Sequence, residues 1–323
     1  MKALEALFPV FFMMFLGYLA RKKNWITREQ DEGAKKIVFQ ILFPFLVYNV
    51  LVSSQLSQHL VVQILFLDAA WIIIYFIGNK TASFTSSQFS RISPFLLLTC
   101  EGGNVALPLY ITMVGSAYAV NIVTFDVAGI LINFGFVPAV IAKQISGRTD
   151  WKDVTKSIFT SSFVIAVLAG VLVNLSGLHS SLMDTSWGPV YTATAEMAIK
   201  PITGIILFTL GYELQIHRSF MKPLIRLAAT RLICCGTIIC LFFLLFPGLM
   251  ADTIFRIGVI FYFLCPTGFP VPLQVTPLIR DSEEEAFMAA FLSLFMVIAL
   301  VAYAVITVIY LYKNSLLSKG MQL

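Results

Sequence analysis

Glu101 and Asp126 are acidic residues inside long apolar stretches of this 323-residue chain. Glu101 interrupts the apolar stretch 94–113, and Asp126 lies in the stretch 119–142. A charged side chain at the centre of a membrane helix costs roughly 2.5–3.5 kcal/mol on insertion scales, so such residues often mark ion or substrate pathways. We therefore predict that Glu101 and Asp126 bind a coupling ion, either a proton or a sodium ion. The alternative is a structural ion-pair partner for each carboxylate.

Glu196, Lys200, Asp68 and Arg231 are also charged residues within apolar stretches. Glu196 and Lys200 are four residues apart, in the order that stabilises a helix, which predicts a local ion pair. As an alternative, Lys200 attracts anions to the entry of a pathway. Asp68 and Arg231 are expected to have structural partners.

The stretch 254–279 is long enough to cross a membrane, but its centre cannot be helical. It contains Pro266, Pro270 and Pro272 around Gly268. A proline removes a backbone donor and clashes with the preceding turn. In hydrocarbon, broken backbone survives only where it is buried in protein or lines a water-filled cavity. The sequence therefore predicts a helix that is broken at mid-membrane beside a binding site.

The stretch 94–113 is interrupted in a similar way. Gly102 and Gly103 come directly before Asn104 at its centre, and Pro108 follows as a second helix-breaking residue. The two broken stretches superpose, with a glycine aligned on a glycine, when one is shifted by 165 residues. Interrupted spans in corresponding halves of a chain are the best sequence indication of the binding site of a secondary transporter.

Each break exposes the start of a second half-helix, whose free N–H groups and partial positive charge attract a carboxylate. Asparagine is a good N-cap, so we expect Asn104 at the start of its half-helix, with its amide in contact with the substrate. Asn49 and Asn133 are expected to bridge helices or to contact the substrate. The predicted substrate-binding residues are Asn104, Gly103, Thr267, Gly268, Gln274, Asn49 and Asn133.

The composition is that of an integral membrane protein. Hydrophobic residues make up 59% of the chain and charged residues 12%, and the mean hydropathy is +0.88. An ordinary soluble domain contains about 25% charged residues. The apolar stretches have the length of membrane helices and lack the alternation of barrel strands, so the predicted fold class is all-α and polytopic.

The cysteines and histidines give no sign of a cofactor. All five cysteines fall in predicted membrane spans, which argues against a disulfide framework, and no CxxC spacing occurs. We therefore expect no metal site, no cofactor and no catalytic residues. The net charge of +5 does not indicate a nucleic-acid partner, because the basic residues lie in short loops at the ends of spans.

The sequence predicts ten membrane spans. They cover approximately residues 4–20, 37–52, 59–78, 94–113, 119–142, 157–175, 195–214, 224–246, 254–279 and 286–312. No small-residue cleavage site follows the first span, which we interpret as retained rather than as a signal peptide. Five spans lie in residues 1–148 and five in 149–323, so the second half enters the membrane from the opposite face, as an inverted repeat.

Basic residues are distributed unevenly between alternate loops. When the loop after the first span is placed in the cytoplasm, 16 of the 22 Lys and Arg residues are cytoplasmic and 5 lie on the other side. The positive-inside rule then places both termini and the connection 176–194 outside, and the connection 143–156 in the cytoplasm.

With these spans and motifs, the chain resembles the auxin efflux carrier family, which includes plant auxin exporters and bacterial malate and malonate permeases. The residues that carry the resemblance are Phe8-Pro9-Val10, Gly17-Tyr18-Leu19, Lys22-Lys23, Phe39-Gln40-Ile41-Leu42-Phe43-Pro44, Gly103-Asn104, Pro108, Leu210-Gly211, Leu214 and the broken stretch 254–279. Lys200 before Pro201 is a departure, since the family pattern is usually uncharged there, and it leaves an unusual substrate preference open.

The resemblance implies a fold similar to that of the bile acid sodium symporters, in which the fourth and ninth spans cross at their breaks. It implies a scaffold of spans 1, 2, 6 and 7 and a transport domain of spans 3–5 and 8–10. It also implies a homodimer that meets through the scaffold, and an elevator-type alternating-access mechanism.

We therefore predict a secondary transporter of the cell membrane whose partners are the lipid bilayer and a small organic anion. Malate or malonate is the leading candidate, and an aromatic carboxylate of the auxin type is the alternative. A channel or receptor would also use broken helices. An intramembrane enzyme is disfavoured, because the HExxH and GxGD motifs are absent.

Overall fold

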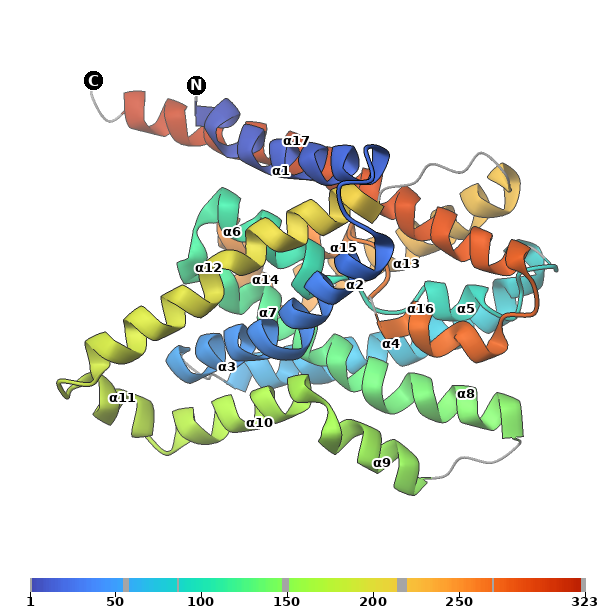
Figure 1. Ribbon diagram of the computed structural model, residues 1–323, viewed down its shortest axis with the longest axis horizontal. Helices are drawn as coiled ribbons and strands as arrows, with labels where there is room; N and C mark the ends of the chain where they lie inside the picture. The colour runs from blue at the N-terminus through green and yellow to red at the C-terminus, as the bar shows by residue number, and fades with distance from the viewer. Residues whose placement is uncertain are drawn as a thin grey trace.

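The described part of the chain consists of helices joined by turns and short non-helical segments (Figure 1). The structure is a computed structural model that describes residues 2–54, 58–85, 87–146, 151–213, 220–268 and 270–320. The side chains of some residues in these ranges, including Asn104, lie outside the description. The predicted all-α fold class is confirmed for the described residues.

Up to residue 146 the helices are α1 (Lys2–Lys22), α2 (Arg28–Ile37), η1 (Val38–Leu42), α3 (Phe43–Ser53), α4 (Gln58–Thr85), α5 (Ser93–Leu96), η2 (Gly102–Ala106), α6 (Leu107–Val114), η3 (Ser116–Tyr118), α7 (Ala119–Leu131), η4 (Ile132–Phe136) and α8 (Val137–Ser146). From residue 151 they are α9 (Trp151–Thr160), α10 (Ser162–Leu175), α11 (Leu178–Met183), α12 (Gly188–Glu213), α13 (Met221–Leu245), α14 (Pro247–Ala251), α15 (Thr253–Phe263), α16 (Pro270–Val275), η5 (Thr276–Leu278) and α17 (Ser282–Gly320). The segments η1, η2 and η4 are single π turns, and η3 and η5 are 3₁₀ turns.

Six helical segments of the described chain are long and apolar enough to cross a membrane. They are Arg28–Ser53, His59–Thr85, Ser116–Ile145, Gly188–Glu213, Met221–Leu245 and Ser282–Tyr312. Each contains most of one predicted span, and two shorter apolar helices, Ser162–Leu175 and Thr253–Phe263, lie in two further spans. The full count of ten spans and the 5+5 repeat stay predictions.

Helices extend beyond two of the predicted spans into polar sequence, where threonine hydroxyls bond within the helix. α4 continues beyond the predicted end of the third span at residue 78 to Thr85, so the polar stretch 79–90 that we interpret as a loop is helical in its first half; the hydroxyl of Thr85 donates to the carbonyl of Thr81 at 3.1 Å. The connection 176–194, which lies between two predicted spans, contains α11 and the first turns of α12. There the hydroxyl of Thr194 donates to the carbonyl of Val190 at 2.8 Å. A hydroxyl that bonds to the carbonyl four residues back satisfies itself within the helix.

α1 packs on α12 through glycines that let the two backbones approach closely. A Cβ atom on Gly17 would lie 1.8 Å from the carbonyl oxygen of Phe208. A Cβ atom on Gly211 would lie 1.9 Å from the carbonyl oxygen of Met14. Small residues allow this kind of close packing between membrane helices. Each of the two helices contributes a glycine, so their backbones approach closely at two points.

α10 packs on α3 and holds its C-terminal end. The side-chain nitrogen of Asn174 donates to the carbonyls of Leu51, Val52 and Ser54 at 2.9, 2.9 and 2.7 Å. These carbonyls belong to the last turn of α3, where intrahelical donors run out. Because α3 also contacts α12, the helices α1, α3, α10 and α12 form one packed group.

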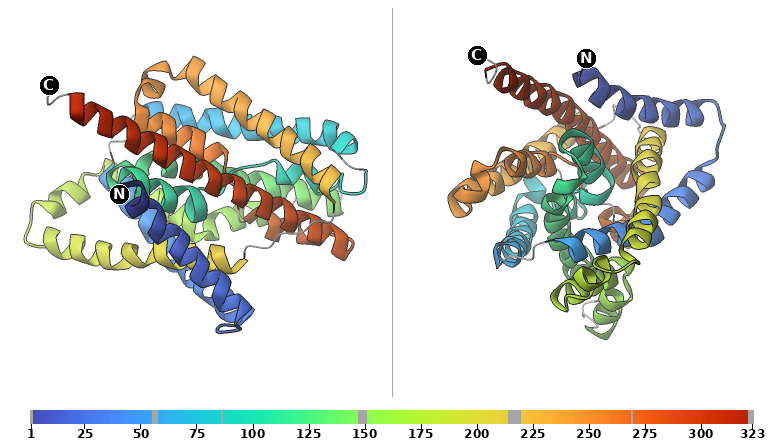
Figure 2. Two further views of the ribbon diagram at one scale, coloured as in Figure 1. Left: turned by 90° about the horizontal axis from the view of Figure 1, so that it is seen from above. Right: turned by 90° about the vertical axis from the view of Figure 1, so that its left-hand side faces the viewer.

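A second group is built around aromatic side chains of α4, α7, α13 and α15. Phe242 of α13 is fully buried, and its ring centroid lies 5.4 Å from Phe66 and 5.6 Å from Phe125. Trp71 of α4 is also fully buried, with its ring 5.8 Å from that of Phe263. Figure 2 shows α4 and α13 on one side of the molecule and α1 and α12 on the other.

Each of the three π turns precedes a proline by two residues. Pro44 follows η1, Pro108 follows η2 and Pro138 follows η4. Proline has no N–H and clashes with the carbonyl four residues before it, so a regular α turn cannot continue unchanged. The wider turn pairs residues five apart, as in the bond from the N–H of Phe43 to the carbonyl of Val38, and the helix passes the proline.

Candidate binding site at the helix crossing

The two predicted breaks are present, and they lie against each other. α5 and α16 are neighbours, and the non-helical segments that follow α5 and α15 meet between them (Figure 1). The N–H of Glu101 donates to the carbonyl of Pro266 at 2.8 Å, which joins one break to the other. The hydroxyl of Thr267 adds a bond to the carbonyl of Leu96. The crossing is therefore held by hydrogen bonds between segments far apart in the sequence.

The second half of the fourth stretch begins earlier than predicted. Helical structure resumes at Gly102 with η2 and continues through α6 to Val114. Asn104 is thus inside a helical turn, so the predicted N-cap position is wrong, while its side chain lies outside the description. Pro108 does not end this helix, because the π turn before it accommodates the proline.

Glycine is required where the ninth stretch approaches the fourth. A Cβ atom on Gly268 would lie 2.7 Å from the hydroxyl oxygen of Thr99 and 3.0 Å from the side-chain nitrogen of Asn133. Thr99 has a φ of 44°, a left-handed conformation that is unusual for a β-branched residue. Its hydroxyl donates to Asn133 Oδ1 at 3.1 Å. Asn133 thus helps to hold this strained residue in place.

Gln274 extends the polar contacts from the crossing to the next helix. Its Nε2 atom donates to the backbone carbonyl of Asn133 at 2.7 Å. Asn133 lies in the π turn η4 and is buried. The sequence predicted Asn133, Gly268 and Gln274 separately, and the structure brings them together.

The two carboxylates predicted from the sequence are neighbours. Asp126 accepts a hydrogen bond from the backbone N–H of Gly102, and the negative charges of Asp126 and Glu101 are close enough to repel each other. A Cβ atom on Gly102 would lie 2.3 Å from Asp126 Oδ1, so the glycine permits this approach. Paired carboxylates inside a membrane protein favour a shared cation, which can be a proton or a metal ion.

A cavity of about 940 Å³ extends from the start of α2 to the crossing. The residues at its inner end are Glu101, Gly103, Asp126, Asn133, Gly268 and Gln274. Exposed charged residues of α2, including Arg28, Glu32 and Lys36, line its outer end, which indicates that the cavity opens there. The volume is in the range of small-molecule sites.

Glu101 also borders a second cavity of about 380 Å³ on the other side of the crossing. Of the predicted residues, this cavity is lined by Glu101, Thr267, Pro266 and Pro272. Arg28, Lys35 and Glu213 line both cavities, so both reach the same charged mouth. The carboxylate of Glu101 therefore lies between two spaces that communicate with one end of the molecule.

The mouth is shaped by an ion-pair network between α2 and α12. Lys35 Nζ lies 3.0 Å from Asp31 Oδ2 and also contacts the carboxylate of Glu213. Asp31 is almost fully buried, with 1% of its surface exposed. The network joins α2 to the end of α12. Asp31 and Lys35 are four residues apart in α2, whereas Glu213 is far away along the chain, so the link between the two helices could not be predicted from sequence spacing.

Phenylalanines form one wall of the larger cavity. Phe43, Phe134 and Phe163 all line it. The ring of Phe163 lies 5.4 Å from that of Phe43 and 6.4 Å from that of Phe134. The cavity thus offers polar groups at the crossing and an apolar aromatic surface opposite them.

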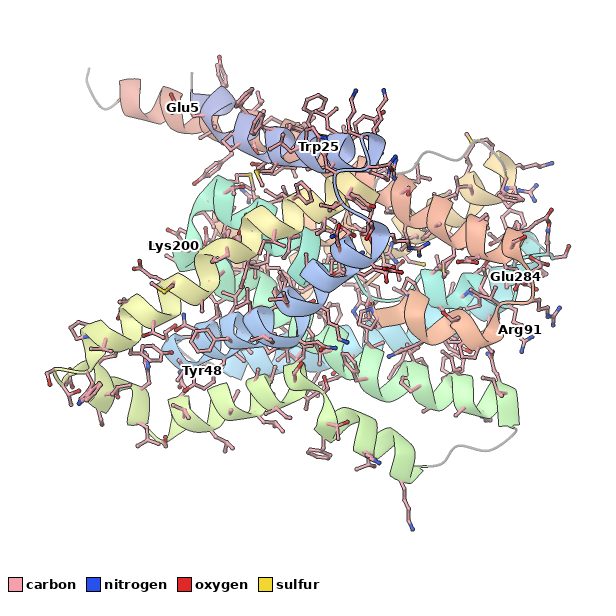
Figure 3. The ribbon with its side chains drawn as sticks, viewed as in Figure 1. Glu5, Trp25, Tyr48, Arg91, Lys200 and Glu284 are labelled. Carbon is pink, nitrogen blue, oxygen red and sulfur yellow. The ribbon has the colours of Figure 1, made fainter. Side chains whose placement is uncertain are left out.

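Several predicted residues lie away from the cavities. Asn49 Oδ1 accepts a bond from the hydroxyl of Tyr191 at 2.8 Å, which confirms that it bridges helices. Lys200 pairs with Glu196 at 2.7 Å, as the spacing predicted, and both side chains are exposed (Figure 3). Neither Asn49 nor Lys200 is among the residues that line the two cavities. Asp68 Oδ1 is buried and has no hydrogen-bond partner among the described residues.

Arg231 has a different kind of partner from the one expected. Its guanidinium is fully buried and donates to backbone carbonyls of both breaks, including that of Thr99 at 2.7 Å and that of Cys265 at 3.2 Å. Arg231 stands out in the sequence as a charge in an apolar stretch. Its partners could not be predicted, because every residue has a backbone carbonyl and the sequence does not show which of them are free.

No cluster of metal-ligating residues is found in the part of the chain that the structure describes. No group of three or more His, Cys, Asp or Glu residues there could hold a metal ion. All five cysteines are free.

Apolar helices of membrane-spanning length, two broken helices that cross, and a cavity that ends at the crossing are features that membrane transporters share. Residues 2–133 match the sequence model of the family described as membrane transport protein. This match supports the resemblance to the auxin efflux carrier family over these residues. The match includes Glu101, Asp126 and Asn133 and ends before the ninth stretch. No curated protein matches the chain.

Proposed function

We propose that this protein is a secondary transporter that carries a small organic carboxylate through the cavity at the helix crossing. The observation that carries the proposal is the cavity of about 940 Å³, which connects a charged mouth to buried polar groups of both broken helices. Broken helices at mid-membrane are the usual substrate sites of secondary transporters. The substrate would bind at Asn133, Gln274 and the glycines of the two breaks, and we retain Asn104 as a proposed contact.

The carboxylates Glu101 and Asp126 are proposed to couple transport to a cation. They are adjacent, and they line the same cavity as the proposed substrate contacts. A cation or proton bound there would neutralise their charge and permit an anion to approach. Arrival of the anion and of the coupling ion would therefore favour each other.

The two walls of the cavity support an elevator mechanism. One wall comes from α2, η1, α3, the α9–α10 junction and α12, which belong to or adjoin the group held together by glycine contacts. The other comes from η2, α7, η4 and α16, around the crossing. We propose that the first set is the scaffold and that the crossing moves past it with the substrate. A homodimer through the scaffold belongs to the same proposal.

Malate or malonate is the leading substrate, and a specific observation favours a second candidate. The phenylalanine wall of Phe43, Phe134 and Phe163 offers an aromatic carboxylate an apolar surface within the same cavity. Ring–ring contacts are worth about 0.5–1.5 kcal/mol beyond the area that they bury. Competition between labelled malonate and an aromatic carboxylate in the same vesicles distinguishes the two.

The proposal is tested by adding one negative charge inside or outside the cavity. Asn133→Asp and Asn49→Asp each keep the oxygen that accepts the existing hydrogen bond, and only Asn133 lines the cavity. In proteoliposomes we expect counterflow of labelled malonate or of the aromatic carboxylate by the wild type. We expect Asn133→Asp to lose at least about tenfold in affinity, which is about 1.4 kcal/mol, and Asn49→Asp to retain it.

Equal loss in the two variants would contradict the assigned site. Counterflow of neutral or cationic solutes, with none of any carboxylate, would contradict the substrate class. Ohmic current in place of saturable counterflow would indicate a channel.

A further inference from the structure

Arg231 lies at the centre of the crossing and is fully buried in α13. None of the ion pairs found among the described residues includes Arg231. Its Nη1 atom donates to the carbonyl of Leu96 at 3.0 Å, and its Nη2 atom donates to the carbonyls of Thr99 at 2.7 Å and Cys265 at 3.2 Å. The ring of Phe295 lies 5.1 Å from the guanidinium carbon. A permanent positive charge is thus held by backbone oxygens and one aromatic ring.

The carbonyls that Arg231 binds are those left open by the two breaks. Leu96 is the last residue of α5, and Thr99 follows it in the non-helical segment. Cys265 follows the end of α15. The last carbonyls of a helix have no intrahelical donor and carry its partial negative charge. In transporters with broken helices, such carbonyls commonly coordinate the coupling sodium ion or proton.

We infer that Arg231 is the resident cation of the crossing. Its guanidinium occupies the carbonyl oxygens of both breaks, so a free metal ion is not needed to hold them together. The guanidinium group suits this role, because its several N–H donors reach carbonyl oxygens of two chain segments at once. For the proposed transport function, on which this part of the inference rests, carboxylate transport is then independent of sodium. The coupling ion at Glu101 and Asp126 is a proton.

The first test uses no substrate. The thermal midpoint of the purified protein is measured in sodium chloride and in N-methylglucamine chloride at equal ionic strength, for the wild type, Arg231→Met, Arg231→Lys and Arg226→Met. Arg226 is the matched control, since it lies in the same helix, is exposed and donates to one carbonyl, that of Phe84, at 3.2 Å. We expect the same midpoint in both salts for the wild type and the control.

Arg231→Met is expected to have a lower midpoint that sodium raises selectively, because the vacated carbonyls then accept a free cation. Arg231→Lys is expected to have the same thermal midpoint in both salts, because the lysine ammonium still supplies a cation. A wild type that sodium stabilises, or an Arg231→Met protein with the wild-type midpoint in both salts, would overturn the inference. If Arg231→Met does not fold, Arg231→Lys decides the matter, and a sodium requirement in that variant overturns the inference.

The second test measures carboxylate counterflow in the same two salts. We expect wild-type rates that agree between the salts and an Arg231→Lys rate lowered at least about tenfold, because a single nitrogen cannot span both breaks as the guanidinium does. Sodium-dependent counterflow by the wild type would contradict the inference and leave the proposed function intact. Absence of any carboxylate counterflow would defeat the proposed function, while the thermal midpoints would still decide whether Arg231 is the resident cation.

Discussion

At the scale of single residues, Glu101 is central to the site, because it borders both cavities. Its backbone N–H joins the fourth stretch to the ninth, and the residue lines the same cavity as Asp126. The same residue thus contributes to the structure of the crossing through its main chain and to its charge through its carboxylate. A side-chain substitution can separate the two contributions.

We expect Glu101→Gln to keep substrate affinity within a few fold and to abolish the pH dependence of transport. Glutamine has the size of glutamate and leaves the main-chain bond to Pro266 in place, but it cannot exchange a proton. Counterflow rates measured over a series of pH values check this. Glu196→Gln is the matched control, since Glu196 is exposed on α12 outside both cavities and should retain the wild-type profile. An unchanged pH profile in Glu101→Gln would show that another group titrates.

The sequence predicted the acidic and amide residues of the site better than their arrangement. Glu101, Asp126 and Asn133 are conspicuous because polar groups inside apolar stretches need a reason. The π turn that contains Asn133 and the acceptors of Arg231 depend on backbone geometry, which has little residue signature. Asn104 was placed at the wrong point of its half-helix, because two glycines allowed the helix to start at Gly102.

At the scale of helices, α1 and α12 approach each other closely at Gly17 and Gly211. Glycines on both partners bring backbone atoms together, and no side chain of either helix could be inserted there. This pair belongs to the proposed scaffold, which an elevator mechanism requires to stay rigid while the other helices move.

We expect Gly211→Val to destabilise the protein by about 1–3 kcal/mol or more, as overpacking of a core does. The added Cβ would lie 1.9 Å from the carbonyl oxygen of Met14. Gly204→Val is the control in the same helix, because the nearest atom to its added Cβ, Met13 Cε, is 4.0 Å away. Thermal unfolding in detergent measures both, and equal midpoints would contradict the packing described.

The helices themselves were predicted from apolar length, and the two main breaks from proline and glycine. The C-terminal end of α4 and the start of α12 were not predicted, because threonine is polar yet its hydroxyl can bond to a carbonyl within the same helix. Predictions of helix ends from polarity alone fail at such residues.

At the scale of the whole molecule, α1 begins and α17 ends at the same end of the structure, and the two helices contact each other (Figures 1 and 2). Arg91 and Glu284 lie toward the opposite end in Figure 3. There the ring of Phe89 stacks on that of Phe287 at 4.0 Å, which joins the turn before α5 to the start of α17. This arrangement agrees with a chain whose termini lie on one side of a membrane.

We expect the cavity mouth to face the cytoplasm and α11 to face outside, as the distribution of basic residues predicts. Thr160→Cys at the cavity and Ser180→Cys in α11 lie beyond opposite ends of α10, and both residues are exposed. A membrane-impermeant thiol reagent should label Thr160→Cys from the cytoplasmic side and Ser180→Cys from the outside. Cys240→Ser is a suitable background, because the other four native cysteines are buried. Labelling of Ser180→Cys from the cytoplasm would reverse the orientation.

The three π turns have a consequence for how such a protein can diversify. Residues of all three line the larger cavity, through Gln40, Gly103 and Asn133. A π turn holds one residue more than an α turn, and each residue rotates a helix by about 100°. Gain or loss of a single residue next to one of these prolines would therefore turn a whole helix face toward or away from the cavity. Insertions and deletions, and not only substitutions, are an evolutionary route to new substrates in this architecture.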